Sequence, residues 1–463
     1  RPVMTLTEPF ADLTYDEMRA IRYRPEKLFW GGEGETWAMD MMPPGFYFNE
    51  KIEVHVVRDG EAREIPFSTD YFHFHPDYFP YPEGKAPAGL AEDHGFTGVR
   101  FRHPINQEGV WDEVAVFQGA SYFRAVARGT LYGLSARGLA IGTGGPEPEE
   151  FPLFTGFWIE EPEPGAENLH LWIRLDSPSV TGAYEMTITP GAETVMAIRC
   201  ALFPRATIDN VGIAPLTSMY FFGPENRIGI DDFRDAVHDS DGLWMTNGGG
   251  ETLWRPLTNP ATVQYSAFQD ENPRRFGLLQ RMREFHHYQD TEAHYERRPS
   301  AWVEPEGDWG PGSVDLVEIP TVDEFSDNIV AYWRPAEPLE PGQRYDFAYR
   351  LTWAQADEFD GLARVIATRA GGSILNDEER VFVIDFDLGV VPFEGLEPRL
   401  SVSAGKIAGS VGISPLPGGN RARVGFHFLP GEAENAEFRL ELVGPNGRAS
   451  EIWLYRWLPE PAA

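Results

Sequence analysis

Residues 169–203 read LHLWIRLDSPSVTGAYEMTITPGAETVMAIRCALF, and this stretch decides the class of fold. Apolar and polar side chains alternate along 169–175, 184–188 and 194–203, with the period of two that is typical of half-buried β-strands. Turn-forming residues separate the three runs. Because no helical pattern lies between them, the stretch predicts neighbouring antiparallel strands rather than parallel strands joined by helices.

Similar β-rich runs are spread over the rest of the chain. They lie at 51–58, 112–117, 313–319, 345–353, 381–388, 400–402, 421–428, 436–443 and 450–458. Helical patterning is confined to 14–23 and part of 282–295. The 47 glycines and 39 prolines favour many turns and few long helices. The sequence therefore predicts an all-β protein.

A chain of 463 residues is too long for one ordinary hydrophobic core. After the predicted strand at 345–353, polar residues lead to the glycines at 371 and 372, which indicates a boundary. We expect a large β-sandwich domain at 1–358, a linker at 359–372 and a small immunoglobulin-like sandwich at 373–463.

Composition limits the partners that this chain can have. The 72 acidic and 39 basic residues give a net charge of -33, which repels phosphate backbones and argues against nucleic acid. A neutral polymer is indifferent to this charge, and 13 Trp, 17 Tyr and 31 Phe offer flat faces for sugar rings. No apolar run approaches the roughly 20 residues that span a bilayer, so stable membrane insertion is not expected.

The first ten residues lack the charged and apolar regions of a signal peptide. If the protein is exported, we expect that its signal peptide has already been removed. Cys200 is the only cysteine, which excludes an internal disulfide and a thiolate metal site.

Short motifs suggest no metal and no cofactor. The run from Asp239 to Gly242 resembles the start of a calcium loop, but Leu243 and Trp244 stand where a ligand and a glycine are needed. The nearby histidines, His286, His287 and His294, lack a zinc-binding spacing.

Residues 238–333 hold the densest mixture of carboxylates, arginines and tryptophans. Arginine and carboxylate groups bind hydroxyl groups, indoles stack on sugar faces, and acids supply protons. The candidates for substrate binding are His238, Arg255, Arg281, Arg283, Trp302 and Trp309. For the last four, a structural packing role stays equally open. Composition alone also leaves binding and catalysis open.

Longer strings carry a resemblance to a known family. They are GASYFR at 119–124, YGLSARGLAI at 132–141, APLTSM at 214–219 and VEIPT at 317–321. On these strings the chain resembles, along nearly its whole length, the osmoregulated periplasmic glucan biosynthesis proteins G and D. The resemblance implies a periplasmic protein that handles β-1,2-linked glucan. It also implies a β-sandwich like that of galactose mutarotases, followed by the immunoglobulin-like domain.

The same resemblance implies an inverting β-1,2-glucanase with two catalytic aspartates. The matching positions are Asp327, in SDNIVA, as general acid and Asp239, in HDSDG, as general base. Tyr295 matches a member of an indirect proton relay through water and substrate hydroxyls. An acid must stay protonated, so we expect burial or neighbouring negative charge around Asp327 and a more polar setting for Asp239.

Three functions remain open at this point. The first is an inverting endo-β-1,2-glucanase that trims or remodels the linear glucan backbone, and the second is a transglycosylase that makes branched or cyclic glucan. The third is a non-catalytic glucan-binding assembly factor. The sequence also leaves open a homodimer, contact with a membrane glucan synthase, and the choice between the G and D types.

Overall fold

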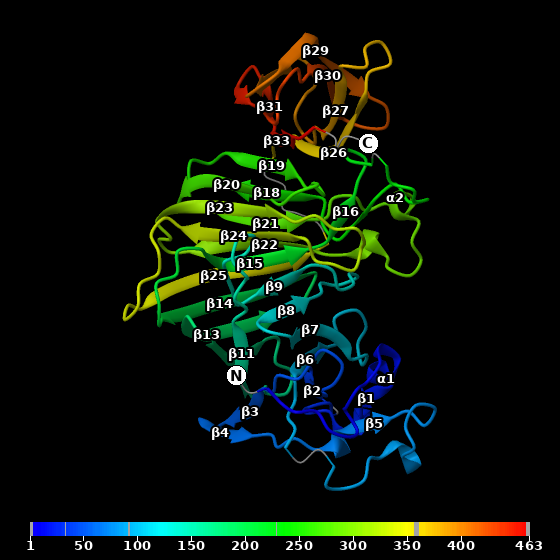
Figure 1. Ribbon diagram of the computed structural model, residues 1–463, viewed down its shortest axis with the longest axis vertical. Helices are drawn as coiled ribbons and strands as arrows, with labels where there is room; N and C mark the ends of the chain where they lie inside the picture. Colours follow the sequence, from blue (N-terminus) through cyan, green and yellow to red (C-terminus); the bar gives the residue numbers. More distant parts are fainter. Residues whose placement is uncertain (1–2, 33, 91–92, 228, 356–360, 460–463) are drawn as a thin grey trace. The chain divides into compact units, whose positions relative to one another are not determined.

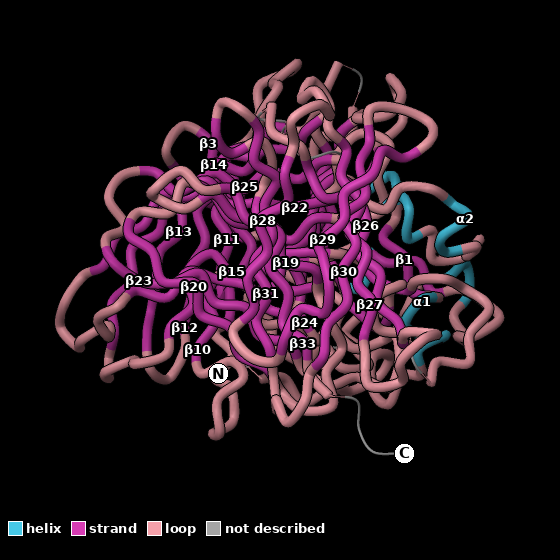
Figure 2. The backbone as a smooth tube through the Cα atoms, turned by 90° about the horizontal axis from the view of Figure 1, so that it is seen from above, coloured by secondary structure: helices cyan, strands magenta, loops and turns pink. Residues whose placement is uncertain are grey.

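The computed structural model describes residues 3–32, 34–90, 93–227, 229–355 and 361–459. Strands occur throughout this part of the chain, whereas helices are few and short (Figure 2). The prediction of an all-β protein is therefore confirmed. The specific likeness to galactose mutarotases stays a prediction.

Contacts divide the chain into two compact units. The first comprises Arg1–Pro215 and Glu337–Ala354, and the second comprises Leu216–Ala336 and Gln355–Ala463. The predicted boundary between 358 and 359 lies outside the described residues, and the domain division stays a prediction. Within the predicted linker, residues 364–372 form a regular strand.

The first unit is built mainly from antiparallel strands. Its elements are α1 (Tyr15–Arg19), β1 (Ile21–Tyr23), η1 (Pro25–Lys27), β2 (Ala38–Met42), β3 (Glu53–Arg58), β4 (Glu61–Glu64), η2 (Thr69–Tyr71), β5 (Phe72–Phe74), η3 (Pro82–Gly84), β6 (Gly98–His103), β7 (Asp112–Gln118), β8 (Tyr122–Ala125), β9 (Ser135–Arg137), β10 (Leu139–Ile141), β11 (Leu153–Glu160), β12 (Leu169–Asp176), β13 (Val180–Thr189), β14 (Glu193–Pro204), β15 (Val211–Ser218) and β25 (Tyr345–Ala354). The strands predicted in this unit coincide with observed strands to within a few residues.

Two sheets of this unit pack through aromatic side chains. One sheet has the order β25-β14-β13-β12-β11-β3-β4, and the other has the order β2-β6-β7-β8-β9. Buried and more exposed residues alternate along β12, β13 and β14, as the sequence predicts. Phe117 of β7 meets Phe154 and Phe157 of β11 at ring distances of 6.4 and 5.6 Å. The alternation therefore supplies one apolar face for each sheet.

The second unit contains the remaining elements. They are β16 (Tyr220–Phe222), β17 (Val237–His238), β18 (Gly242–Thr246), β19 (Thr252–Pro256), β20 (Gln264–Glu271), β21 (Arg275–Leu279), α2 (Phe285–Tyr288), η4 (Tyr295–Arg297), β22 (Ser300–Glu306), β23 (Pro311–Glu318), β24 (Ile329–Pro335), β26 (Arg364–Gly372), β27 (Arg380–Asp387), β28 (Glu397–Val402), β29 (Lys406–Leu416), β30 (Arg421–Leu429), β31 (Ala436–Gly444), β32 (Gly447–Arg448) and β33 (Ile452–Trp457).

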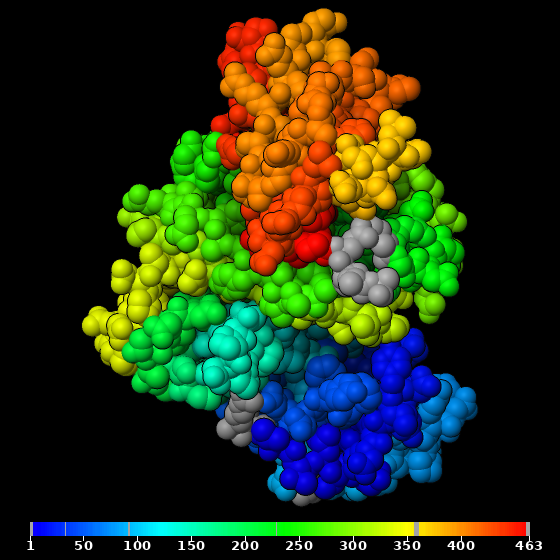
Figure 3. Space-filling view, turned by 45° about the horizontal axis from the view of Figure 1, so that its top comes forward, coloured from blue at the N-terminus to red at the C-terminus, as the bar shows by residue number. Residues whose placement is uncertain are grey.

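The strands after residue 360 form a sandwich. The sheet β26-β27-β30-β29 faces strands β28, β31 and β33. This part of the chain is coloured from yellow to red in Figures 1 and 3. Its core is aromatic, since Phe438 of β31 lies 5.3 Å from Phe382 and 4.8 Å from Phe428, measured between ring centroids. Strand β33 also pairs in parallel with β19, which continues this sheet into the earlier part of the unit.

The two predicted helices are shorter than the sequence suggests. Thr14 and Glu17 form a capping box that starts α1, but the helix ends at Arg19. Ile21 and Tyr23 then bury alternate side chains as β1, which pairs with β5. Within 282–295 only α2 forms. No helix in the described ranges is long and apolar enough to cross a membrane.

The aromatic core of the sandwich provides a test of stability. Phe438→Ala should lower the free energy of unfolding by about 3–5 kcal/mol, because it leaves a cavity among packed rings. Phe438→Leu should cost less than Phe438→Ala. Denaturant unfolding measures both variants, and Val390→Ala at a side chain that is 79% exposed is the control. An unchanged midpoint for Phe438→Ala would contradict this account of the core.

Candidate active site

The two aspartates proposed for catalysis lie beside the same short segment, Ser218–Tyr220. Asp239 follows β17, and its backbone N–H donates to the carbonyl of Met219 at 2.8 Å. Asn328, which follows Asp327, donates its backbone N–H to the carbonyl of Ser218 at 3.1 Å. Successive carbonyls of an extended chain point to opposite sides. The segment therefore lies between the two aspartates.

Strand spacing gives the scale of this arrangement. Neighbouring backbones in a sheet lie about 4.8 Å apart, and Asp239 and Asn328 are each hydrogen-bonded to the same segment. Inverting glycosidases hold their carboxyl groups about 6.5–9.5 Å apart, with room for a water molecule. The backbone arrangement is compatible with such a pair.

The side chain of Asn328 fixes the chain beside Asp327. Its amide nitrogen donates to the carbonyls of Tyr220 and Ile319, each at 3.0 Å. Its amide oxygen accepts from the backbone N–H of Tyr220 at 2.8 Å. Asn328 is buried, so these bonds are shielded from water. They hold the start of β24 at a defined position against β16.

The two aspartates differ in exposure, in the opposite sense to our expectation. Asp239 is 8% exposed, and its carboxylate lies 3.5 Å from the guanidinium of Arg298. Asp327 lies in a loop and is exposed. Burial of Asp327, one of the two alternatives that we expected for the acid, is not observed, because its loop is exposed to solvent.

Tyr295 lies close to the base. Its hydroxyl donates to Glu324 at 3.1 Å. Burial raises the pKa of Tyr295, and the negative charges of Glu324 and Asp239 raise it further. The phenol therefore stays protonated at neutral pH and can act in a relay only by exchanging hydrogen-bonded protons. Gln280 positions it, since one amide group donates to the backbone carbonyls of His238 and Tyr295.

The six predicted substrate-binding residues are mostly engaged within the protein. His238 is buried, stacks on Tyr220 at 5.3 Å and hydrogen-bonds Gln280. Burial lowers the pKa of His238 to about 3, so the imidazole is neutral. Arg255 pairs with Glu318 at 3.1 Å, and Arg281 pairs with Glu451 at 2.6 Å. These contacts favour a positioning role over direct contact with a sugar.

The other three predicted substrate-binding residues, Arg283, Trp302 and Trp309, are also engaged or buried within the protein. Arg283 donates to the backbone carbonyls of Glu296 and Arg298. Trp302 is 1% exposed and Trp309 is 6% exposed, so neither presents a free face for stacking. Their predicted contact with glucan stays a prediction, and their burial argues against it.

Sequence reasoning missed a network that joins two loops at the site. Arg234 pairs with Glu324 at 2.7 Å, and with Asp232 and Asp290 at 2.8 Å each. Glu324 belongs to the loop that precedes Asp327, and it also accepts the hydrogen bond of Tyr295. The network therefore links that loop to the relay tyrosine. No motif marks this network, because Asp290 and Glu324 are distant from Arg234 in sequence.

The exposed aromatic residues near the aspartates were also missed. Phe233 is 72% exposed and Phe325 is 89% exposed, and each lies on one of the two loops that Arg234 and Glu324 connect. Exposed apolar side chains rimmed by polar groups often mark binding sites. In sequence they cannot be told from core phenylalanines.

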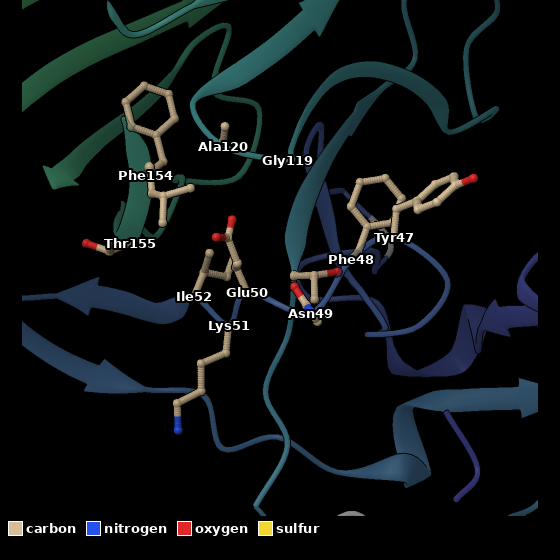
Figure 4. A pocket seen from close by; sticks show the side chains of 12 residues that line it. Tyr47, Phe48, Asn49, Glu50, Lys51, Ile52, Gly119, Ala120, Phe154 and Thr155 are labelled. Carbon is tan, nitrogen blue, oxygen red and sulfur yellow. The ribbon is translucent and has the colours of Figure 1, made fainter. Parts of the chain in front are cut away.

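Two cavities, one in each unit, differ in whether predicted site residues line them. A small cavity of 190 Å³ in the first unit is lined by Glu50, Lys51 and Phe154 and holds none of the predicted site residues (Figure 4). A cavity of 480 Å³ in the second unit is lined by Glu225, Asp241 and some of those residues, including His238 and Arg281. Burial raises the pKa of Glu225 to about 7 and that of Asp241 to about 6. Among the residues that the structure describes, no group of three or more His, Cys, Asp or Glu side chains is arranged for a metal ion.

Fold and site together define an all-β protein with a two-carboxylate site and exposed aromatic side chains. Residues 1–457 match the family described as "Periplasmic glucan biosynthesis protein, MdoG", and the chain belongs to this family. The family predicted from the sequence is thus confirmed.

Curated relatives cover nearly the whole chain. "Glucans biosynthesis protein G" of Vibrio cholerae serotype O1 (strain ATCC 39541) is 45% identical over 456 residues, which are 98% of this chain and 82% of the relative. A protein of the same name from Shewanella sp. (strain W3-18-1) is 43% identical over 465 residues, which are 99% of this chain and 84% of the relative.

The raised pKa of Glu225 predicts a pH dependence of stability. Between about pH 4.5 and 7 the folded chain binds more protons at this group than the unfolded chain, so stability falls as pH rises. In the wild type, the free energy of unfolding should fall by up to about 3 kcal/mol over this pH range because of Glu225. Glu225→Gln should abolish this part of the fall, since the amide carries no charge. Denaturant unfolding at pH 5 and pH 8 measures it. Glu61→Gln at an exposed position is the control, and an equal pH dependence of Glu225→Gln and wild type would contradict the assignment.

Proposed function

We propose that the protein is an inverting endo-β-1,2-glucanase that trims or remodels the linear backbone of periplasmic glucans. One observation carries the proposal: Asp239 and Asn328, the residue after Asp327, both donate backbone hydrogen bonds to the segment Ser218–Tyr220, as a pair of acids at one site would require. Membership of a family named for periplasmic glucan biosynthesis supplies the substrate class. A β-1,2-linked glucan is neutral and is therefore not repelled by the acidic protein.

In this proposal the two aspartates have different tasks. Asp327 protonates the departing glycosidic oxygen, and Asp239 receives the proton of the attacking water. The Arg298 guanidinium lies 3.5 Å from the carboxylate of Asp239. The negative charge of Asp239 raises the pKa of Tyr295, and in this proposal water and substrate hydroxyls connect the two groups.

Transglycosylation is the second candidate, and the burial of Asp239 favours it. A base that is 8% exposed has restricted access to bulk water. A sugar hydroxyl held beside it can then compete with water as acceptor, which yields branched or cyclic products. Mass spectrometry of the products distinguishes the reactions. Hydrolysis gives only shorter linear chains, with one water added for each bond cleaved. Transfer releases a shorter chain and gives either a cyclic product, one water lighter than the linear chain of equal length, or a branched product longer than the starting chain.

The pair of acids provides the main test of catalysis. Asp327→Asn and Asp239→Asn should each reduce cleavage of linear β-1,2-glucan by roughly 10²–10⁴ fold, the usual contribution of an acid or base. Binding of the glucan should persist, because neither change removes a large contact surface. Release of reducing ends measures the rate, with β-1,3 and β-1,4 glucans as substrate controls.

Asp308→Asn, at an exposed aspartate elsewhere in the second unit, is the matched variant and should keep full activity. Wild-type rates in Asp327→Asn would reject the catalytic assignment. Binding of glucan by a wild-type protein that yields neither hydrolysis nor transfer products would instead identify an assembly factor.

The two exposed phenylalanines predict where the sugar rings stack. Phe233→Ala and Phe325→Ala should each weaken binding of linear β-1,2-glucan by roughly tenfold, because stacking on an aromatic face is worth about 1 kcal/mol or more. Calorimetry in the inactive Asp327→Asn background measures affinity without cleavage. Phe203→Ala, at another exposed phenylalanine, is the control, and unchanged affinity in both loop variants would contradict the stacking role.

A further inference from the structure

The first unit contains a cavity of 680 Å³ that the proposed catalysis does not use. It is lined by strands β2 and β6 and by the segment from α1 to η1. Four arginines line it: Arg19, Arg22, Arg100 and Arg102. Asp239 and Asp327 belong to the other unit, so this cavity is a separate feature of the chain.

A fully buried carboxylate orients two of these arginines. Asp40 on β2 is 0% exposed and stands opposite Arg100 on β6. Arg100 and Arg102 are two residues apart on β6 and so share one face. Their Nε–H groups donate to the two oxygens of Asp40, at 2.6 and 2.7 Å. The carboxylate therefore holds both guanidinium groups side by side through their inner nitrogens.

The outer nitrogens of these guanidinium groups make longer contacts. Arg100 Nη1 lies 3.3 Å from Glu113, and Arg102 Nη2 lies 3.7 Å from the same carboxylate. Arg102 Nη1 lies 3.5 Å from the carbonyl of Trp111. The contacts at 3.3 and 3.5 Å are long hydrogen bonds, and the contact at 3.7 Å is an ion pair without a hydrogen bond. The terminal N–H groups therefore keep donor capacity for a stronger acceptor.

The charge balance of the cavity is opposite to that of the chain. Four arginines stand against Asp40 and Glu113, which leaves two positive charges in a protein with a net charge of -33. Arg19 and Arg22 are exposed at its rim, where they can reach an incoming ligand. Guanidinium forks match the geometry of carboxylate and phosphate groups. A ligand bound here would carry such a group.

The other side chains that line the cavity indicate the chemical nature of the uncharged part of the ligand, its body. Tyr23, Phe48 and Trp111 line the same cavity and offer apolar and aromatic surface. Its volume lies in the range of small-molecule sites, which combine such walls with a few oriented polar groups. Inorganic phosphate alone would leave the aromatic wall unused.

We propose that this cavity is a binding site for a small organic anion, in which the arginines hold a phosphate or carboxylate group and the aromatic wall contacts its body. The site does not depend on the proposed glucanase activity, because it uses other residues in the other unit. Its ligand serves as an effector or a second substrate.

Isothermal titration of the full chain at low ionic strength tests the proposal. The probes are glucose 6-phosphate, inorganic phosphate and glucose. We expect glucose 6-phosphate to bind more tightly than phosphate, and glucose not to bind at this site. Equal affinity for glucose and glucose 6-phosphate, or no binding of either phosphate compound, would overturn the proposal. Binding of inorganic phosphate as tight as glucose 6-phosphate would overturn the role of the aromatic wall.

Variants locate the binding to this cavity. The double variant Arg19→Gln/Arg22→Gln should weaken binding of glucose 6-phosphate by roughly tenfold or more, because it removes two charges from the rim. Both side chains are exposed, so the fold should be kept. The matched control is Arg63→Gln/Arg344→Gln, which removes the same charge from exposed positions of the same unit. An equal loss of affinity in both double variants would show a non-specific charge effect and would refute the site.

Discussion

The candidate site depends on one constraint, the hydrogen bonding of segment Ser218–Tyr220 on both of its sides. Carbonyls of successive residues accept from Asp239 on one side and from Asn328 on the other. The buried amide of Asn328 adds three further bonds to the same region. Because a buried backbone group that lost its partner would be costly, this arrangement resists slippage. Two residues 88 positions apart in sequence are thereby held at a defined separation.

Different contacts hold the chain around the two aspartates. Gln280 connects the backbone of His238 to that of Tyr295, so the base and the relay tyrosine belong to one buried framework. The Asp327 loop is instead held by the ion pair of Glu324 with Arg234, which is itself bonded to two more carboxylates. Asp239 is thus held within the buried framework, whereas Asp327 is exposed on its loop.

The acidic composition explains why two of the candidate arginines pair with carboxylates. With 72 acidic and 39 basic residues, an arginine that becomes buried readily finds a carboxylate partner. Arg255 and Arg281 are both used in this way, with Glu318 and Glu451. A buried arginine without such a partner would strongly destabilise the fold. Buried arginines therefore lie where a carboxylate can pair with them. The cavity beside Asp40 is different, since arginines there outnumber carboxylates.

The sequence by itself determined the all-β class, most strand positions and the family, because alternating side chains and long matched strings are local properties of the chain. It also singled out Asp239, Asp327 and Tyr295, though only through resemblance. Tertiary structure alone decided that Trp302 and Trp309 are buried, that Asp327 is exposed, and that Phe233 and Phe325 are exposed on two loops joined by the Arg234–Glu324 ion pair. These outcomes depend on which distant strands and loops pack together, and side-chain type does not encode that choice.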